Sequence, residues 1–184
     1  MTAPIVRAAI DDDRPSVRAL VRAAFFASDG GREELDIVER TWSSGAAVPG
    51  LELVAVDGGD VVGHVLTAFG DLGGQAVAAV APLAVAPSHQ RHGIGTALME
   101  SLLKGAEGAR LPLVLLLGSP DFYRRFGFEP AAALGITYAA VDRADPAFQA
   151  RRLSAFDPAL AGVFVYCWEL DSPASSDGSP SGRT

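Results

Sequence analysis

Strand-like runs of β-branched residues alternate with segments of helical periodicity in the N-terminal part of the chain. Residues Ile5–Ala9 form the first strand-like run. The acidic cluster at 11–13 then supplies caps and negative charge for a helix that we expect to reach Phe26. After a break at 28–31, apolar residues recur at helical spacing over Arg32–Trp42. This part of the chain therefore predicts one strand followed by two helices.

Strand signals dominate the next part of the chain. The runs Leu51–Val56 and Val61–Phe69 are separated by residues 57–60, whose sequence Asp-Gly-Gly-Asp has the turn chemistry of a β-hairpin. Another run that we expect to be antiparallel covers Ala76–Ala86. Together these runs predict a sheet built from strands that follow one another along the chain.

Helical and strand patterns alternate again in the second half. Thr96–Glu107 has the spacing of a helix, and the continuous apolar run Leu113–Leu117 is typical of a buried strand. A short helix is expected to follow the Gly-Ser-Pro sequence at 118–120 and to end at Gly127, since Pro favours helix starts and Gly favours helix ends. Phe128 then begins the last part of the predicted sheet.

The C-terminal part is less regular. Residues 131–161 mix Ala, Pro and charges without a clean period, so no element is predicted there, and a final strand is expected over Val163–Trp168. Residues 171–184 are nearly all Ser, Gly, Pro and Asp, a composition too poor in apolar surface to order itself. We therefore predict a single α/β domain over residues 1–170 and a disordered tail beyond it.

Composition narrows the classes of function. The 184 residues include 15 basic and 22 acidic ones, and the net charge of −7 disfavours nucleic acid and anionic membrane surfaces as partners. Cys167 is the only cysteine, so an intrachain disulfide and a cysteine-based zinc site are excluded, and we expect no metal. The chain lacks a signal-like apolar run and a membrane-length apolar stretch, which predicts a soluble, cytoplasmic protein.

The segment Ala81–Leu103 carries the most chemical information. Pro82 has no N–H to donate, and Pro87 restricts its neighbour, so the strand between them cannot form a complete ladder. Backbone groups near Leu83–Val85 are thereby available to a ligand.

A glycine turn follows this interrupted strand. The pattern Gln90-x-x-Gly93-x-Gly95 places backbone amides close together at a helix N-terminus, where the helix dipole favours a diphosphate. A P-loop is excluded because no Gly-Lys-Ser/Thr follows, and Leu98 occupies the position of the third glycine of a dinucleotide fingerprint. The turn therefore predicts a phosphate-bearing ligand of another class.

At this point the chain resembles the GNAT acetyltransferase superfamily. QRHGIG, at 90–95, fits the acyl-CoA motif Q/R-x-x-G-x-G/A, and LGSPDFYRRFGFEPA, at 117–131, is similar to the later segment that ends in Y-x-x-x-G-F. Together with PLAV-x-P the sequence is most similar to the YhbS-like branch. The resemblance implies a GNAT-like mixed, mostly antiparallel twisted sheet flanked by helices, with a central strand pair that is splayed near Leu83–Val85.

The resemblance also implies an activity. In this family an amine attacks the thioester of acetyl-CoA directly, within a ternary complex, so the expected function is N-acetyl transfer to a primary amine. Backbone groups of Leu83 and Val85 would contact the pantetheine arm, the turn would hold the pyrophosphate, and Tyr123 would protonate the departing thiolate. Ser119 could bind the cofactor arm or help to orient Tyr123, and it could equally cap a helix. The implied cofactor-binding residues are Leu83, Ala84, Val85, Gln90, Arg91, His92, Gly93, Ile94, Gly95, Thr96 and Ser119.

The acceptor amine also needs a general base or a water relay, because a lysine-like amine arrives protonated. The candidates are Glu33, Glu34, His64 and Asp121. An acidic pair in a first helical turn is commonly dipole compensation, however, and one histidine in an apolar strand is more often a hydrogen-bonded packing residue. For Cys167 we expect packing in a strand rather than an acyl-enzyme.

Other residues and other functions stay open at this point. Arg91 and the Arg124-Arg125 pair could reach the phosphates of the cofactor or could equally be solvated. The expected acceptor is a small-molecule or peptide amine, and a homodimer is a family-based expectation. An acyl-CoA-binding sensor without turnover is the alternative function, and a scaffold that merely uses the fold is a third.

Overall fold

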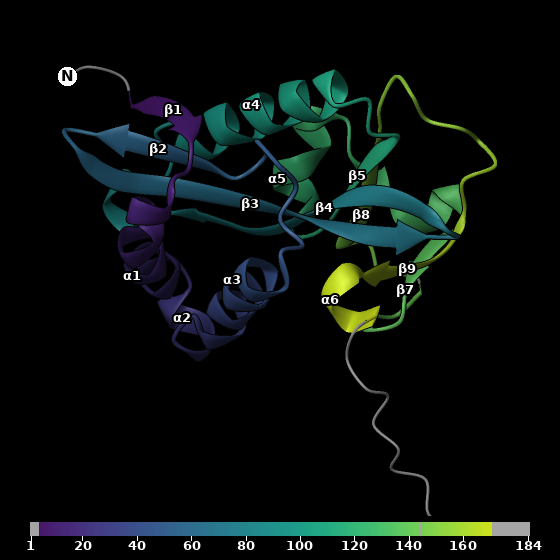
Figure 1. Ribbon diagram of the computed structural model, residues 1–184, viewed down its shortest axis with the longest axis horizontal. Coiled ribbons are helices and arrows are strands. Elements are labelled where there is room, and N and C mark those ends of the chain that lie inside the picture. Colours follow the sequence, from purple (N-terminus) through teal and green to yellow (C-terminus); the bar gives the residue numbers. More distant parts are fainter. Residues whose placement is uncertain (1–3, 144, 171–184) are drawn as a thin grey trace, which may run out of the picture.

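A twisted sheet with helices on both faces forms the body of the molecule, and the computed structural model describes residues 4–143 and 145–170 (Figure 1). The strands are β1 (Ile5–Ala8), β2 (Leu53–Asp57), β3 (Asp60–Leu72), β4 (Gln75–Val85), β5 (Leu113–Leu117), β6 (Glu129–Pro130), β7 (Ile136–Tyr138), β8 (Phe148–Arg152) and β9 (Gly162–Tyr166). The helices are α1 (Arg14–Ala24), α2 (Phe26–Asp29), α3 (Arg32–Ser44), α4 (Ile94–Gly108), α5 (Pro120–Tyr123) and α6 (Cys167–Leu170).

The sheet follows the order β1-β2-β3-β4-β5-β8-β6, and β9 pairs with the far end of β3 and with β7. The pairs β4–β5 and β7–β9 are parallel, whereas the other described strand pairs are antiparallel. This confirms the predicted mixed, mostly antiparallel fold.

Apolar side chains on alternate positions of the strands face different helices. Helix α4 lies on one face of the sheet and packs Leu98, Met99 and Leu102 against it. Helices α1 and α3 lie on the other face and bury Val21 and Val38 (Figure 1). Each face thus has its own core, and the sheet separates α4 from α1 and α3.

The sheet opens between β4 and β5. Their parallel pairing covers only Ala78 with Val114 and Ala79 with Leu115, and β4 then continues to Val85 without β5 beside it. On its other edge β4 stays paired with β3 as far as Val85, across a register shift opposite Pro82. Because proline has no N–H, it interrupts the ladder as expected. The predicted splay is therefore present.

Most predicted elements are confirmed up to Gly127, with differences at their ends. The predicted N-terminal helix ends at Ala24, because Phe25 leaves helical dihedrals, and a separate turn of helix, α2, covers part of the expected break. The carboxylate of Asp13 accepts a hydrogen bond from the Ile10 N–H (2.9 Å) instead of capping α1. The short helix predicted after Ser119 is α5, which a 3-10 turn over Arg124–Phe126 continues as far as Gly127, whose left-handed conformation ends it as predicted.

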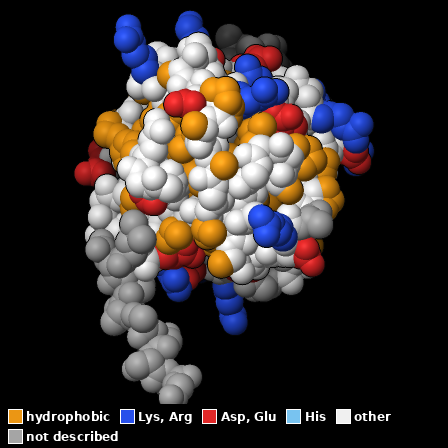
Figure 2. Space-filling view, turned by 90° about the vertical axis from the view of Figure 1, so that its right-hand side faces the viewer, with side chains coloured by type: hydrophobic (Ala, Val, Ile, Leu, Met, Phe, Trp, Pro, Cys, Tyr) orange, Lys and Arg blue, Asp and Glu red, His pale blue; other side chains and the backbone are white. Residues whose placement is uncertain are grey.

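The C-terminal part differs more. The region left unassigned contains β7 and β8, and β8 lies between β5 and β6 in the sheet. The predicted last strand ends at Tyr166, so the expectation that Cys167 packs in a strand is wrong: it is half-buried and begins α6. The predicted disordered tail lies outside the described residues. At this end of the molecule hydrophobic side chains are scattered among charged and polar ones (Figure 2).

Candidate functional site

A cavity of about 1200 Å³ opens where β4 and β5 separate. It is lined from both faces of the sheet, since α4 and α5 contribute residues from one side and α1 and α3 from the other. Its walls include the strand ends at Leu83 and Leu117, the turn before α4, and the aromatic side chains of α5. Residues far apart in the sequence therefore share one space.

The separated end of β4 contributes part of this wall. Leu83 and Val85 line the cavity, whereas the side chain of Ala84 is buried against the α1 and α3 core. The Gln90 side chain donates from Nε2 to the Val85 carbonyl oxygen (3.2 Å). Because β5 does not pair with this end of β4, the edge of β4 faces the cavity. The Val85 carbonyl oxygen already accepts a hydrogen bond from Gln90, however.

The glycine turn lies at the N-terminus of α4, which spans more than three turns. Arg91 and Gly93 both have left-handed dihedrals (φ 63° and 83°), and Gly93 precedes the first helical residue. Such a turn aims consecutive backbone N–H groups outward at the positive end of the helix dipole. The predicted residues that line the cavity here are Gln90, Arg91, Gly93, Ile94, Gly95 and Thr96, and His92 is exposed outside it.

Tyr123 lines the cavity from the opposite side of the gap. Its ring packs edge-on against Phe122 and Phe128, with centroids 4.9 and 5.8 Å away, and it lies directly against the backbone of Gly118. Burial raises the pKa of the Tyr123 hydroxyl to about 12. The phenol therefore keeps its proton throughout the physiological pH range.

The polar residues around α5 divide into two groups. Ser119 lines the cavity and stands at the N-cap position of α5, where its side chain makes no capping hydrogen bond. Asp121 is exposed outside the cavity and forms an ion pair with Arg124. Arg125 lines the cavity, with its guanidinium carbon 4.9 Å from the centroid of the Phe122 ring.

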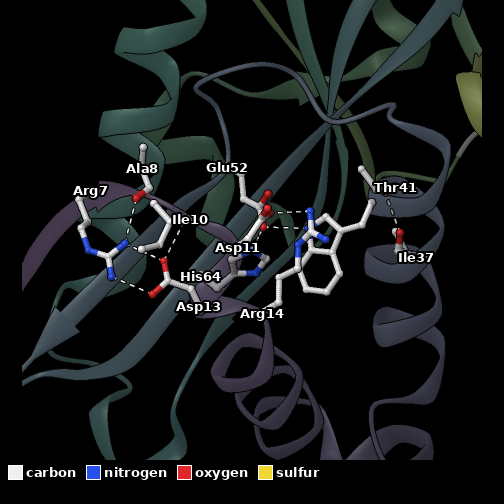
Figure 3. A network of polar contacts seen from close by, with 11 residues as sticks. Arg7, Ala8, Ile10, Asp11, Asp13, Arg14, Ile37, Thr41, Glu52 and His64 are labelled. Atoms are coloured by element: carbon white, nitrogen blue, oxygen red, sulfur yellow. Dashed lines mark hydrogen bonds and ion pairs between the residues drawn. The ribbon is translucent and has the colours of Figure 1, made fainter.

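Of the base candidates, the structure brings only Glu33 and Glu34 to the cavity. His64 lies in a buried polar network instead (Figure 3), with its Nε2 3.1 Å from Glu52 Oε1, and Trp42 donates from Nε1 to the same oxygen (3.0 Å). The imidazole is fully buried on the α1 side of the sheet. His64 is thus a hydrogen-bonded packing residue, and it does not reach the candidate site.

Sequence reasoning missed the aromatic residues of the cavity. Tyr138, Phe148 and Tyr166 line it, as do Phe25 and the exposed end of β5. Tyr138 and Phe148 lie in residues 131–161, where apolar residues show no clear period. Only their aromatic character could have indicated that they line a cavity. Tyr166 was assigned to a strand, correctly, but nothing in its neighbourhood indicated a cavity.

Within the described ranges 4–143 and 145–170, no cluster of three or more His, Cys, Asp or Glu side chains could hold a metal ion. None of the helices in this described part has both the length and the apolar character needed to cross a bilayer.

Comparisons with known proteins agree with this geometry. The family model of the acetyltransferase (GNAT) domain matches residues 49–130. The uncharacterized N-acetyltransferase YhbS of Escherichia coli K12 is 32% identical over 162 residues, which are 86% of this chain and 92% of the relative. The uncharacterized N-acetyltransferase YjhQ of the same organism is 35% identical over 127 residues, which are 65% of this chain and 66% of the relative.

Solved structures give the same result. The crystal structure of E. coli YhbS in complex with CoA has a TM-score of 0.81 at 29% identity and covers 94% of each chain. A GNAT family acetyltransferase from Brucella melitensis in complex with acetyl-CoA has a TM-score of 0.72 at 26% identity, covering 89% of this chain and 95% of the other.

Proposed function

Because the chain belongs to the YhbS-like branch of the GNAT acetyltransferase family, we propose that it transfers the acetyl group of acetyl-CoA directly to a primary amine. One observation carries this proposal: a single cavity joins the glycine turn at the N-terminus of α4, the open edge of β4 and the partly buried phenol of Tyr123. The diphosphate of acetyl-CoA would lie at the glycine turn, its pantetheine arm along the edge of β4, and its thioester beside Tyr123.

The cofactor half of the proposal rests on backbone chemistry. The amides of residues 90–96 would bind the pyrophosphate at the helix N-terminus, with Arg91 and Arg125 adding positive charge from the walls. The pantetheine amides would pair with the edge of β4 near Leu83, as a strand would. The CoA and acetyl-CoA complexes of the two similar structures support this choice of cofactor.

The transfer step uses the tyrosine as a proton donor. The amine nitrogen attacks the thioester carbon, a C–N bond forms, and the C–S bond breaks as the thiolate of CoA departs. The Tyr123 hydroxyl donates its proton to that thiolate and recovers one from solvent afterwards. Burial raises the pKa of the phenol to about 12. Desolvation also raises the pKa of a nearby thiol, so the pKa values of the proton donor and of the thiol become more similar.

The amine must lose two protons, one from the ammonium group before the attack and one from the nitrogen after the C–N bond has formed. Glu33 and Glu34 line the cavity on the side of α3, and either carboxylate, directly or through water, would accept the first proton. The second would pass to the solvent, which returns one to the phenolate of Tyr123. Holding both substrates in one cavity would supply much of the rate enhancement, because it makes the reaction effectively unimolecular.

Calorimetric titration with acetyl-CoA tests the cofactor site. Gly93→Glu places a bulky anion in the turn and is expected to weaken binding by at least tenfold, since like charges would meet. Gly74→Glu is the matched control, because Gly74 has a similar φ (88° against 83°), its Cβ would also meet no atom within 4 Å, and it lies at the other end of β4. The control should bind acetyl-CoA like the native chain.

Thiol release in the presence of amines then separates an enzyme from a sensor. Amine-dependent release of CoA by the native chain would support the transfer reaction. Tight binding of acetyl-CoA without release by any amine would instead favour the sensor, and absence of binding by the native chain would overturn the proposal.

A further inference from the structure

The two ends of the cavity carry opposite charge. Arg91 and Arg125 line it near the N-terminus of α4, where Arg125 lies over the ring of Phe122. The carboxylates that line it within the described residues are Glu33 and Glu34, both at the start of α3 on the other face of the sheet. Anionic phosphates and a cationic acceptor would therefore be drawn to different ends.

Beside the acidic end, three rings form an aromatic wall, made of Tyr138, Phe148 and Tyr166. Tyr138 lies 5.8 Å from Phe148 and 5.7 Å from Tyr166, measured between ring centroids. The Tyr138 hydroxyl donates to Glu169 Oε1 (3.0 Å), and the Tyr166 N–H donates to the other oxygen of that carboxylate (3.0 Å). With its hydroxyl engaged, Tyr138 offers its ring to the cavity, and Glu169 holds Tyr138 and Tyr166 together.

The aromatic wall lies next to the proposed point of reaction. Phe148 is the direct cross-strand neighbour of Leu117, where β5 ends at the gap. The next residue, Gly118, packs against the ring of Tyr123. One side of the β5 end thus faces the proposed proton donor and the other faces the wall.

The glutamates reach the same place from the other side. Helix α6 begins directly after Tyr166 and contacts α3, the helix that carries Glu33 and Glu34. Figure 1 shows α3 and α6 on the same side of the sheet. Rings, carboxylates and the thioester position therefore surround one space.

From this arrangement we propose that the acceptor is an arylalkylamine: a primary amine joined by a short linker to an aromatic ring and carrying no carboxylate. The inference rests on the proposed N-acetyl transfer. The ring of the acceptor would pack on the aromatic wall, while Glu33 and Glu34 would attract its ammonium group before the proton is lost. A polyamine has no apolar body to cover the wall, and an amino acid would bring its carboxylate toward the glutamates.

Thiol release from acetyl-CoA with matched amines tests the two halves of this inference. 2-Phenylethylamine and n-butylamine share one positive charge and differ in the ring, so the first should have a kcat/KM at least roughly tenfold higher. 2-Phenylethylamine and phenylalanine share the ring and differ in the carboxylate, and we expect a preference of about tenfold or more for the amine.

Variants assign each preference to its residues. Tyr138→Leu should reduce the preference for the ring about tenfold, whereas Tyr138→Phe, which keeps the ring, should retain it. Glu33→Gln combined with Glu34→Gln removes the proposed proton acceptors and should slow transfer to every amine, while the ratios of the remaining rates should show less discrimination against phenylalanine and an unchanged preference over butylamine. All these variants should bind acetyl-CoA with native affinity by calorimetry, which separates the acceptor site from folding.

Faster transfer to spermidine or to a lysine peptide than to 2-phenylethylamine would overturn this inference and leave the proposed acetyl transfer intact. Equal transfer to 2-phenylethylamine and butylamine would do the same. Failure of every amine to release CoA would overturn the proposed function, and this inference with it.

Discussion

Tyr123→Phe is the sharpest test of the transfer chemistry, because it removes one hydroxyl and keeps the packing of the ring. The ring contacts with Phe122, Phe128 and Gly118 involve carbon atoms that phenylalanine also has. The fold and the binding of acetyl-CoA should therefore survive the substitution. Only the proton donor to the departing thiolate is lost.

The expected loss follows from the environment of Tyr123. Burial raises the pKa of its hydroxyl from 10.0 to about 12, so full proton transfer to a thiol of ordinary pKa, about 8.5, would be uphill by roughly 5 kcal/mol. In the transition state the proton is still on the phenol, which donates a hydrogen bond to the developing thiolate, and such bonds to charged groups contribute about 1.5–3 kcal/mol; the proton passes to the thiolate afterwards. Losing such a bond should lower kcat by about 10- to 150-fold.

The assay measures kcat by thiol release with the best amine acceptor and the Kd of acetyl-CoA by calorimetry. We expect kcat to fall while Kd stays within about threefold. A fall in kcat of less than threefold would refute the role of Tyr123. An alkaline limb in kcat with a midpoint between about pH 8 and 10 that disappears in Tyr123→Phe would contradict the raised pKa.

Three further substitutions test the surroundings of the site and the fold. Gly118→Ala should lower kcat about tenfold with little change in the affinity for acetyl-CoA, because its Cβ would lie 2.4 Å from Cε2 of the packed Tyr123 ring; kinetics and calorimetry check this. Asp13→Asn should cost about 1–2 kcal/mol of unfolding free energy at pH 7 in urea titrations, because the carboxylate accepts two hydrogen bonds from Arg7. Those bonds lower the pKa of Asp13 below its usual 3.8, so its contribution is present above that pH and the difference between native and variant should shrink as the pH falls below it. His64→Leu should cost about 1–3 kcal/mol of unfolding free energy and leave kcat within about twofold, since this buried imidazole lies outside the cavity; a large loss of kcat in a folded variant would restore it as a base candidate.

Local signals explain which parts of the site could be predicted from the sequence. Pro82 interrupts a strand because it has no N–H, and Gly93 adopts a left-handed conformation because it has no Cβ. Neither effect depends on the rest of the fold. The short helix that carries Tyr123 is likewise bounded by Pro120 and Gly127, which act within a few residues. The proposed cofactor side of the cavity is built from such elements, so the sequence predicted those elements.

The proposed acceptor side depends on partners that are distant in the sequence. Strand β7, with three residues, pairs with β9, and β8, with five, lies between β5 and β6; runs this short do not indicate which strands they pair with. The position of Tyr138 at the cavity follows from that pairing. No pattern within residues 131–161 could have given it.

His64 shows the same limit in a buried strand. It shares its side of β3 with Leu66, which faces α1, while Gly63 faces α4. Alternation along the strand could therefore have placed His64 on the α1 face. Its partner Glu52 lies on another segment, so only the folded chain shows that the imidazole is occupied in a polar network.

The gap between β4 and β5 allows residues from both faces of the sheet to line one cavity. A continuous sheet would separate the glycine turn at α4 from Glu33 and Glu34 on α3, because these helices cover opposite faces. The cavity is lined from both faces only because pairing stops after Ala79, where β4 diverges from β5. In the proposed reaction, two substrates that enter from opposite faces would then meet at the end of β5, beside Tyr123, and direct transfer would need no acyl-enzyme to carry the acetyl group between them.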